Sequence, residues 1–308
     1  MTFEKAKSLY YKDWKTRLRK TSYNSLTNMI DNILKKSHFP IEKNIKKITE
    51  NDIVLFKEKA LQIYTSNSVY KAMSAINNIF DMLEKRGILK KNVTKHLQKI
   101  KQNRYKVQNI ITVKDFFLLT YEISKFKEKI ISKKEVILFL TLLFKTGLRH
   151  SEARSLRWDN INFEMGILTV TNSLYCNTYA YYELTETKTM SSKRSIHLDK
   201  VLLNELKEYH AKSPFNSRSD FIFCRKDGIP RIASFGKVEL LKAAKKIGVK
   251  INTHGLRHSH ASFLLQNQIN ILKISRRLGH SSIEVTLKIY CHLLGEDEED
   301  IMKLLENI

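Results

Sequence analysis

The sequence is poor in residues that interrupt helices and in residues that cross-link chains. Its 308 residues include 3 prolines and 9 glycines, which excludes collagen-like and proline-rich architectures and leaves room for long helices. Cys176, Cys224 and Cys291 lie far apart without a CxxC pair, which argues against a disulfide framework and a cysteine-rich zinc module. No apolar run approaches the ~18–20 residues of a membrane span, and the N-terminus lacks the apolar core of a signal peptide. We therefore expect a cytoplasmic protein.

Positive charge is abundant. The chain carries 55 Lys and Arg against 31 Asp and Glu, which gives a formal net charge of +24. Basic residues outnumber acidic ones on both sides of residue 110, so both halves of the chain suit a polyanion, and nucleic acid is the first candidate. A membrane surface fits less well, because no lysine-rich segment has the broad apolar face of an interfacial helix. With 42% hydrophobic residues, the chain is expected to fold rather than remain a basic tail.

Helical periodicity dominates the first hundred residues. Apolar side chains recur at helical spacing, and Thr49-x-x-Asp52 is typical of a capped helix start. A further helix is predicted over residues 69–85. The basic, weakly patterned stretch that follows is typical of a linker. We predict a helical domain over residues 1–104 and a linker over residues 105–112.

Residues 113–308 form a second predicted domain of mixed character. A helix starts at Thr112-x-x-Asp115, and an apolar helix follows over residues 136–144. Three runs have the composition and length of strands: residues 167–171, 181–187 and 194–198. A polar turn over residues 188–193 joins the last two runs. Helical patterns then return over residues 202–209, 234–247, 254–266 and 271–278. The predicted fold class is mainly α with a small antiparallel β-sheet.

Two segments place charged side chains beside apolar helical faces. In residues 146–158, Gly147 can end one helix and leave Arg149 at the entrance of the next. In the second segment, His254 and Arg257 are three residues apart and therefore share one face of a helix. Each segment has an ordinary interpretation as well, namely a capped helix start with solvated side chains.

A third segment, residues 278–290, contains His280 and Tyr290. A single tyrosine is ordinarily a packing residue. Taken together, however, two arginines, two histidines, a lysine and a tyrosine form a set suited to phosphoryl transfer without a metal. Guanidinium groups stabilise charge on nonbridging oxygens, a tyrosine oxygen can form a covalent ester, and an ammonium can protonate the departing sugar oxygen.

Four segments, in this order, resemble the signature boxes of tyrosine recombinases: TGLRHSEARSLRW, TKTMSSKRSIHL, HGLRHSHAS and LGHSSIEVTLKIY. They are most similar to those of phage and transposon integrases of Gram-positive bacteria. The resemblance implies a two-domain clamp around duplex DNA, with a core-binding domain over residues 1–104 and a catalytic domain over residues 113–308. Many such integrases carry a further N-terminal domain that binds arm-type sites. This chain begins almost directly with the core-binding helices, so we expect an arm-less recombinase or a shortened form of a longer one.

The resemblance implies catalytic roles for six residues: Arg149, Lys188, His254, Arg257, His280 and Tyr290. The two arginines would bind the scissile phosphate, and His280 would form a hydrogen bond with it. Tyr290 would attack and form a 3′-phosphotyrosyl link, while His254 would exchange a proton near this nucleophile. Lys188 would protonate the leaving 5′ oxygen, with Lys193, five residues on, as the rival for that role.

These roles imply a site-specific recombinase that exchanges strands through a Holliday junction, for the integration or excision of a mobile element. The alternatives are a Xer-like role in dimer resolution, type IB topoisomerase chemistry, which usually needs a longer chain, and a non-catalytic DNA-binding protein, which would not need the full set of residues. No cofactor is expected, since the ester conserves the bond energy without ATP or a metal. A metal site at His254, His258 and His260 is disfavoured, because no glutamate occupies the HExxH position and no cysteine lies near.

The C-terminal tail predicts a docking helix. After the acidic residues 296–300, four apolar residues follow at helical spacing: Ile301, Leu304, Leu305 and Ile308. The helix would pack on its own domain or, as the resemblance implies, on a neighbouring protomer of a homotetramer bound to double-stranded recombination sites. Accessory DNA-bending or excision factors would be further partners.

Overall fold

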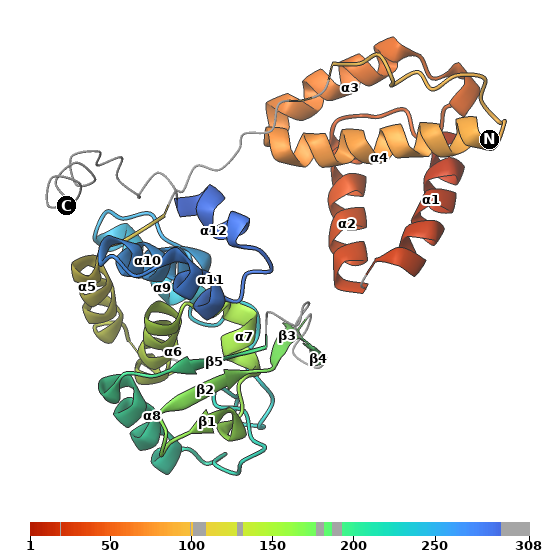
Figure 1. Ribbon diagram of the computed structural model, residues 1–308. Helices are drawn as coiled ribbons and strands as arrows, with labels where there is room; N and C mark the ends of the chain where they lie inside the picture. Colours follow the sequence, from red (N-terminus) through yellow and green to blue (C-terminus); the bar gives the residue numbers. More distant parts are fainter. Residues whose placement is uncertain are drawn as a thin grey trace, which may run out of the picture. The chain divides into compact units, whose positions relative to one another are not determined.

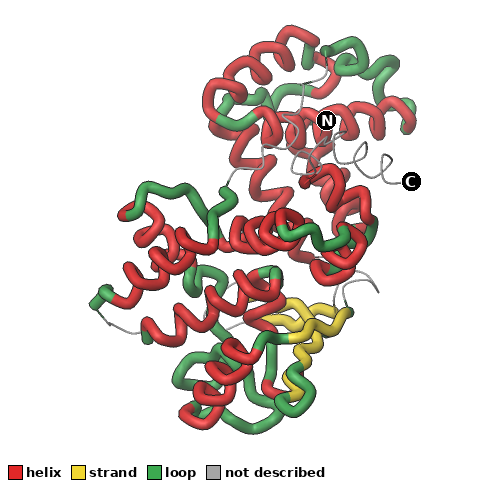
Figure 2. Tube along the Cα trace, turned by 60° about the vertical axis from the view of Figure 1, so that its left-hand side comes forward, coloured by secondary structure: helices red, strands yellow, loops and turns green. Residues whose placement is uncertain are grey.

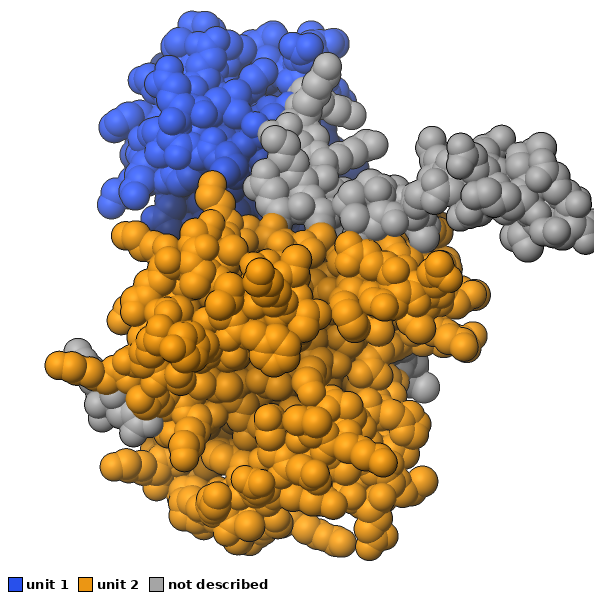
Figure 3. All heavy atoms as spheres, turned by 90° about the vertical axis from the view of Figure 1, so that its left-hand side faces the viewer, with its two compact units in different colours: residues 1–106 blue, residues 107–308 orange. Residues whose placement is uncertain are grey.

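The computed structural model describes residues 1–18, 20–98, 100, 109–127, 132–176, 182–186 and 193–290. The chain divides into two compact units, residues 1–106 and residues 107–308, which Figure 3 shows in different colours. Helices predominate in both units, and the strands lie in the second (Figure 2). No helix within the described ranges is both long and apolar enough to cross a bilayer. The predicted fold class, mainly helical with a small antiparallel sheet, is confirmed.

The described part of the first unit contains four α-helices and one 3-10 turn (Figure 1): α1 (Phe3–Arg17), α2 (Lys20–Lys36), η1 (Ile45–Lys47), α3 (Glu50–Ile63) and α4 (Ser66–Lys85). Helix α4 contacts the other three α-helices. Helix α3 begins at the predicted capping box, where the Asp52 amide donates to Thr49 Oγ1 and the Thr49 amide donates to the Asp52 carboxylate. Helix α4 begins three residues before the predicted start.

Aromatic rings fill the core of the first unit. Phe3, Phe39, Phe56 and Phe80 are all buried, and the Phe39 ring lies 4.5 Å from the Phe3 ring and 5.0 Å from the Phe56 ring. Burial of side chains of this size contributes about 1.5–3 kcal/mol each. Within the part of the chain that the structure describes, the two large hydrophobic clusters share no residue, so each unit has a core of its own.

Helix α6 (Lys133–Thr146) is the central helix of the second unit. Its apolar residues are buried, apart from Ile137, which is partly buried. Four helices pack against it: α5 (Val113–Ser124), α7 (His150–Ser155), α8 (Lys200–Lys212) and α10 (Thr253–Gln266). Three further helices complete the described part of the unit: α9 (Lys237–Lys246), α11 (Ile271–Leu278) and α12 (Ile283–Tyr290). Phe116 stacks on Phe144 with ring centroids 4.2 Å apart, which fixes α5 on α6.

The strands form two small antiparallel sheets. The first has the order β1 (Ile161–Asn162), β2 (Ile167–Val170), β5 (Arg194–His197), and it follows the 3-10 turn η2 (Trp158–Asn160). The second pairs β3 (Asn172–Cys176) with β4 (Tyr182–Glu186). The last two predicted runs therefore do not pair with each other. Strand β3 does not follow from the sequence pattern, because Asn172 and Ser173 interrupt the β-rich composition at its start.

The predicted linker over residues 105–112 falls partly within the described chain. Ile111 is buried in the core of the second unit, and its amide donates to Ser259 Oγ at 2.9 Å. Thr112 and Asp115 form the predicted capping box at the start of α5. Residues 109–112 thus pack on the second unit. Residues 105–108 of the linker, residues 188–192 of the predicted turn and the tail over residues 291–308 lie outside the described residues.

Candidate active site

The C-terminal end of α6 positions the first predicted arginine. Gly147 ends this helix, as predicted, with φ 69°, a left-handed conformation that favours glycine. A Cβ atom at this position would lie 2.7 Å from His260 Cδ2 and 2.7 Å from Leu278 Cδ2. Only a glycine therefore fits without displacing its neighbours. The reversed chain places Arg149 at the N-cap of α7, with its side chain partly exposed.

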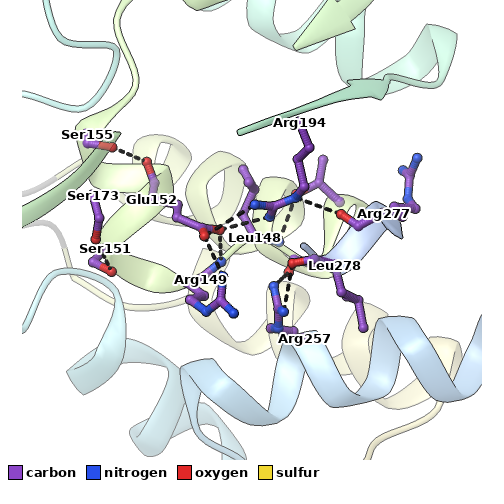
Figure 4. Close-up of polar contacts among 12 residues, drawn as sticks. Leu148, Arg149, Ser151, Glu152, Ser155, Ser173, Arg194, Arg257, Arg277 and Leu278 are labelled. Carbon is purple, nitrogen blue, oxygen red and sulfur yellow. Dashed lines mark hydrogen bonds and ion pairs between the residues drawn. The ribbon is translucent and has the colours of Figure 1, made fainter. Parts of the chain in front are cut away.

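Arg149 shares a buried carboxylate with a second arginine (Figure 4). Arg149 Nη1 donates to Glu152 Oε1 at 2.7 Å, and the Arg149 amide donates to Glu152 Oε2 at 2.8 Å. Arg194, the first residue of β5, donates to the same two oxygens at 3.3 and 2.9 Å. Burial raises the pKa of Glu152, but the hydrogen bonds and charge of Arg194 and the charge of Arg149 outweigh this effect and lower it overall. Glu152 is therefore an ionised carboxylate held between two guanidinium groups.

Arg257, on α10, is held by backbone carbonyl groups. Its Nη1 donates to Gly147 O at 2.7 Å and its Nη2 donates to Leu278 O at 2.8 Å, while the residue is only 2% exposed. Burial and then the charge of Arg149 lower the pKa of Arg257 to about 9. The guanidinium is still charged at neutral pH. No carboxylate within the described chain forms an ion pair with it, and a buried cation of this kind gains stability from a bound anion.

Tyr290, the last residue of α12, lies against α10. Its hydroxyl is 2.7 Å from His258 Nδ1, and the residue is 2% exposed. Burial raises the pKa of Tyr290 well above its usual value, although the charge of Arg257 acts in the opposite direction. Burial, followed by His254 and Arg257, lowers the pKa of His258 to about 4. The neutral His258 imidazole can therefore accept a hydrogen bond from the phenol.

The remaining predicted histidines lie in the same positive field. The His254 ring contacts the His258 ring edge to face, with centroids 4.6 Å apart. Burial and the charges of Arg257 and Arg149 lower the pKa of His254. His280 Nδ1 lies 2.7 Å from Thr286 Oγ1, and burial together with the nearby arginines lowers the pKa of His280 to about 3. Both imidazoles are therefore neutral in the absence of a bound anion.

The structure brings five of the six predicted site residues together in the second unit: Arg149, His254, Arg257, His280 and Tyr290. Lys188 lies outside the described residues. Lys193 is exposed and stands directly before β5. The roles assigned to these residues remain predictions.

Three residues of the site were not predicted. Glu152 stands three residues after Arg149 at a helix start, a spacing typical of a capping box, and this signal was available in the sequence. His258 stands four residues after His254 on the same helix face and, unlike His254, reaches the Tyr290 hydroxyl. Arg194 gave no signal, because its partner Glu152 is 42 positions away.

The three histidines of the disfavoured metal site, His254, His258 and His260, lie in different surroundings. His254 and His258 contact each other beside Tyr290, whereas His260 accepts a hydrogen bond from Arg277 Nε at 3.1 Å. Within the residues that the structure describes, no group of three or more His, Cys, Asp or Glu side chains is arranged to hold a metal ion.

Comparison with known proteins identifies the family. The model of the phage integrase family matches residues 120–296. The ICEBs1 integrase of Bacillus subtilis is 27% identical over 284 residues, which are 88% of this chain and 74% of that protein. The Tn1549 transposon integrase, solved in complex with a circular intermediate DNA, matches with a TM-score of 0.78 and 17% identity over 100% of this chain and 99% of that one. A lambda integrase tetramer bound to a Holliday junction matches with a TM-score of 0.69 and 15% identity over 92% and 78% of the two chains.

The fold and the site define a tyrosine-type site-specific recombinase, an enzyme that cleaves and rejoins DNA. The chain belongs to the phage integrase family. The two solved structures establish that the fold is shared along both units of the chain, while the ICEBs1 relative connects the sequence with integrases of mobile elements.

Proposed function

We propose that the protein recombines two DNA sites through a 3′-phosphotyrosyl intermediate at Tyr290 and a Holliday junction, and that its natural reaction is the integration or excision of a mobile element. One observation carries the proposal. The Tyr290 hydroxyl lies 2.7 Å from His258, the residue next to Arg257 on α10, and Arg257 Nη1 donates at 2.7 Å to the carbonyl of Gly147, two residues before Arg149. The tyrosine proposed as the nucleophile and the two arginines proposed to bind the phosphate therefore belong to one cluster of side chains.

In the proposed reaction, Arg149 and Arg257 bind the nonbridging oxygens of the scissile phosphate. The Tyr290 oxygen attacks phosphorus, and its proton passes to His258 Nδ1, with which the hydroxyl shares a hydrogen bond. In this proposal His258 takes the role that the resemblance implies for His254, whose ring contacts that of His258. As the new phosphorus–oxygen bond forms, the bond to the 5′ oxygen breaks. The guanidinium groups stabilise the negative charge that builds up on the phosphate.

The departing 5′ oxygen takes its proton from a lysine, for which Lys188 and Lys193 are the candidates. In the reverse reaction a free 5′ hydroxyl attacks the phosphotyrosine and gives its proton to the lysine. The bond between phosphorus and the Tyr290 oxygen breaks, and His258 returns its proton to the phenol. When the hydroxyl belongs to the second DNA, the strands are exchanged. The ester conserves the bond energy, so the reaction needs neither ATP nor a metal.

Both units are proposed to bind the phosphate backbone of duplex DNA, because basic residues are in excess in each of them. The tail over residues 296–308 is proposed to dock on a neighbouring protomer in a tetramer. The support comes from its apolar stripe and from the lambda integrase relative, which was solved as a tetramer on a Holliday junction.

A nicked suicide substrate, from which the cleaved strand end diffuses away, tests the proposal. Tyr290→Phe should retain DNA binding and form no covalent adduct, because the phenyl ring fills the same space without the attacking oxygen. Tyr209→Phe is a matched control, because Tyr209 is a largely buried tyrosine of the same unit whose pKa burial also raises, and its adduct should form normally.

An adduct that persists in Tyr290→Phe would remove Tyr290 from its role. Binding without any adduct in the parent protein would favour a non-catalytic DNA-binding protein. Relaxation of a supercoiled plasmid that carries no partner site would favour topoisomerase chemistry.

A further inference from the structure

The geometry points to Arg194 as a positioning residue that holds both phosphate-binding arginines in place. This inference rests on the proposed function, in which Arg149 and Arg257 bind the scissile phosphate. The Arg194 side chain is 6% exposed, so it acts from beneath the site rather than on the DNA. It connects to the two arginines along two separate routes.

The first route runs through the shared carboxylate. Each oxygen of Glu152 accepts one hydrogen bond from Arg194 and one from Arg149 (Figure 4). A carboxylate gripped by two parallel N–H groups of one guanidinium has a defined plane and position. Arg194 therefore fixes the orientation of the Glu152 carboxylate that accepts the hydrogen bonds of Arg149.

The second route runs through the C-terminal end of α11, where Arg277 and Leu278 are the last two residues. Arg194 Nε donates to the carbonyl of Arg277 at 2.7 Å. The next carbonyl along the chain, that of Leu278, accepts from Arg257 Nη2 at 2.8 Å. Arg194 and Arg257 thus hold consecutive carbonyl groups, so a displacement of one guanidinium shifts the partner of the other (Figure 4).

Charge supplies a further reason for a third arginine here. Without Arg194, the ion pair of Arg149 and Glu152 would be neutral overall and would attract a phosphate weakly. With Arg194 on the same carboxylate, the group of three carries a net positive charge. Arg194 therefore leaves the charge of Arg149 available to the anion while Glu152 still fixes the position of Arg149.

Two substitutions separate position from charge. Arg194→Lys keeps the charge but loses the forked geometry, since an ammonium cannot reproduce a bidentate guanidinium. Arg194→Gln loses both. The matched control is Arg231→Lys, because Arg231 also grips a buried carboxylate, Glu135, with two of its nitrogen atoms and takes no part in the cluster around Arg149.

Cleavage is measured on two suicide substrates, one with the natural scissile phosphate and one with a methylphosphonate at that position. The methyl group removes the charge that the arginines stabilise, so the reaction depends less on their placement. Arg194→Lys should slow cleavage of the phosphate by about 10²-fold, the order expected for a misplaced reacting group, with little change in DNA affinity. On the methylphosphonate its rate should approach that of the parent protein.

Arg149→Ala is the positive control for recovery on the methylphosphonate, and Arg231→Lys is the negative control. Arg149→Ala should cleave the phosphate substrate slowly and the methylphosphonate substrate at close to the parent rate. If Arg231→Lys lowers the cleavage rate at all, it should do so by the same factor on both substrates. If Arg149→Ala recovers and the two Arg194 variants do not, Arg194 acts only on folding and the inference is wrong. If Arg149→Ala itself fails to recover, the proposed phosphate role of Arg149 is wrong. Should Arg194→Gln fail to fold, as thermal melting would reveal, the lysine variant alone decides.

Discussion

The conformation and close surroundings of Gly147 predict the outcome of replacing it by alanine. At φ 69° an L side chain costs about 1–2 kcal/mol relative to glycine. The added Cβ would also lie 2.7 Å from both His260 and Leu278, and overpacking of a tight core typically costs about 1–3 kcal/mol. Gly147→Ala should therefore destabilise the second unit by about 2–5 kcal/mol.

Gly248→Ala separates the two contributions. Gly248 belongs to the same unit and has φ 75°, but no atom lies within 4 Å of its would-be Cβ. Gly248→Ala should therefore cost only the backbone part, about 1–2 kcal/mol. Scanning calorimetry of the whole protein measures the difference, at about 2–4 °C per kcal/mol for a unit of this size.

Gly147→Ala should also slow DNA cleavage, because the carbonyl of Gly147 accepts a hydrogen bond from Arg257. At a temperature where the variant is fully folded, cleavage of a suicide substrate should fall more than DNA affinity does. Equal losses of stability in the two glycine variants would refute the close packing at Gly147. Unchanged cleavage by a folded Gly147→Ala protein would refute the link between this carbonyl and the placement of Arg257.

Three further predictions follow from the site. Arg149→Ala and Arg257→Ala should each slow cleavage by about 10²–10³-fold with a far smaller change in DNA affinity. If the cleavage rate and the DNA affinity fell by similar factors, the two arginines would only position the DNA. Because the pKa of His258 is about 4 in the folded chain and higher when unfolded, the unfolded state binds more protons between pH ~6.5 and ~4. The free energy of unfolding should therefore fall as the pH drops through this window, with a smaller slope in His258→Asn; an identical slope in denaturant titrations would contradict the assigned burial. Of Lys188→Ala and Lys193→Ala, the variant that lacks the general acid should cleave ordinary DNA slowly and DNA with a sulfur leaving atom normally, since a thiolate leaves without a proton.

Local patterns were sufficient for most of the helices. The capping boxes at Thr49 and Thr112 marked two helix starts, and the apolar spacing placed α11 at its observed bounds. Strand pairing depends on contacts between distant segments, and local composition does not encode it. The pairing of β5 with β2 and of β4 with β3 was therefore beyond the sequence patterns.

The candidate site divides in the same way. The resemblance supplied the residue types and their order, and the structure brings Arg149, Arg257 and Tyr290 into one cluster. The resemblance could not predict the hydrogen bond between His258 and the phenol of Tyr290. Spacing places His254 and His258 on the same helix face and does not say which of them reaches the phenol. Nor could the resemblance identify Arg194, because its side chain meets Arg277 only once β5 lies beside the C-terminal end of α11.

The separate cores of the two units have an evolutionary consequence. Among the described residues, the two core clusters have no side chain in common, so mutations that repack the first cluster leave the residues packed around α6 unchanged. The interior of the first unit can therefore change by mutation without altering the core that supports the candidate site. For protein engineers, the core of either unit can be redesigned without refilling the core of the other.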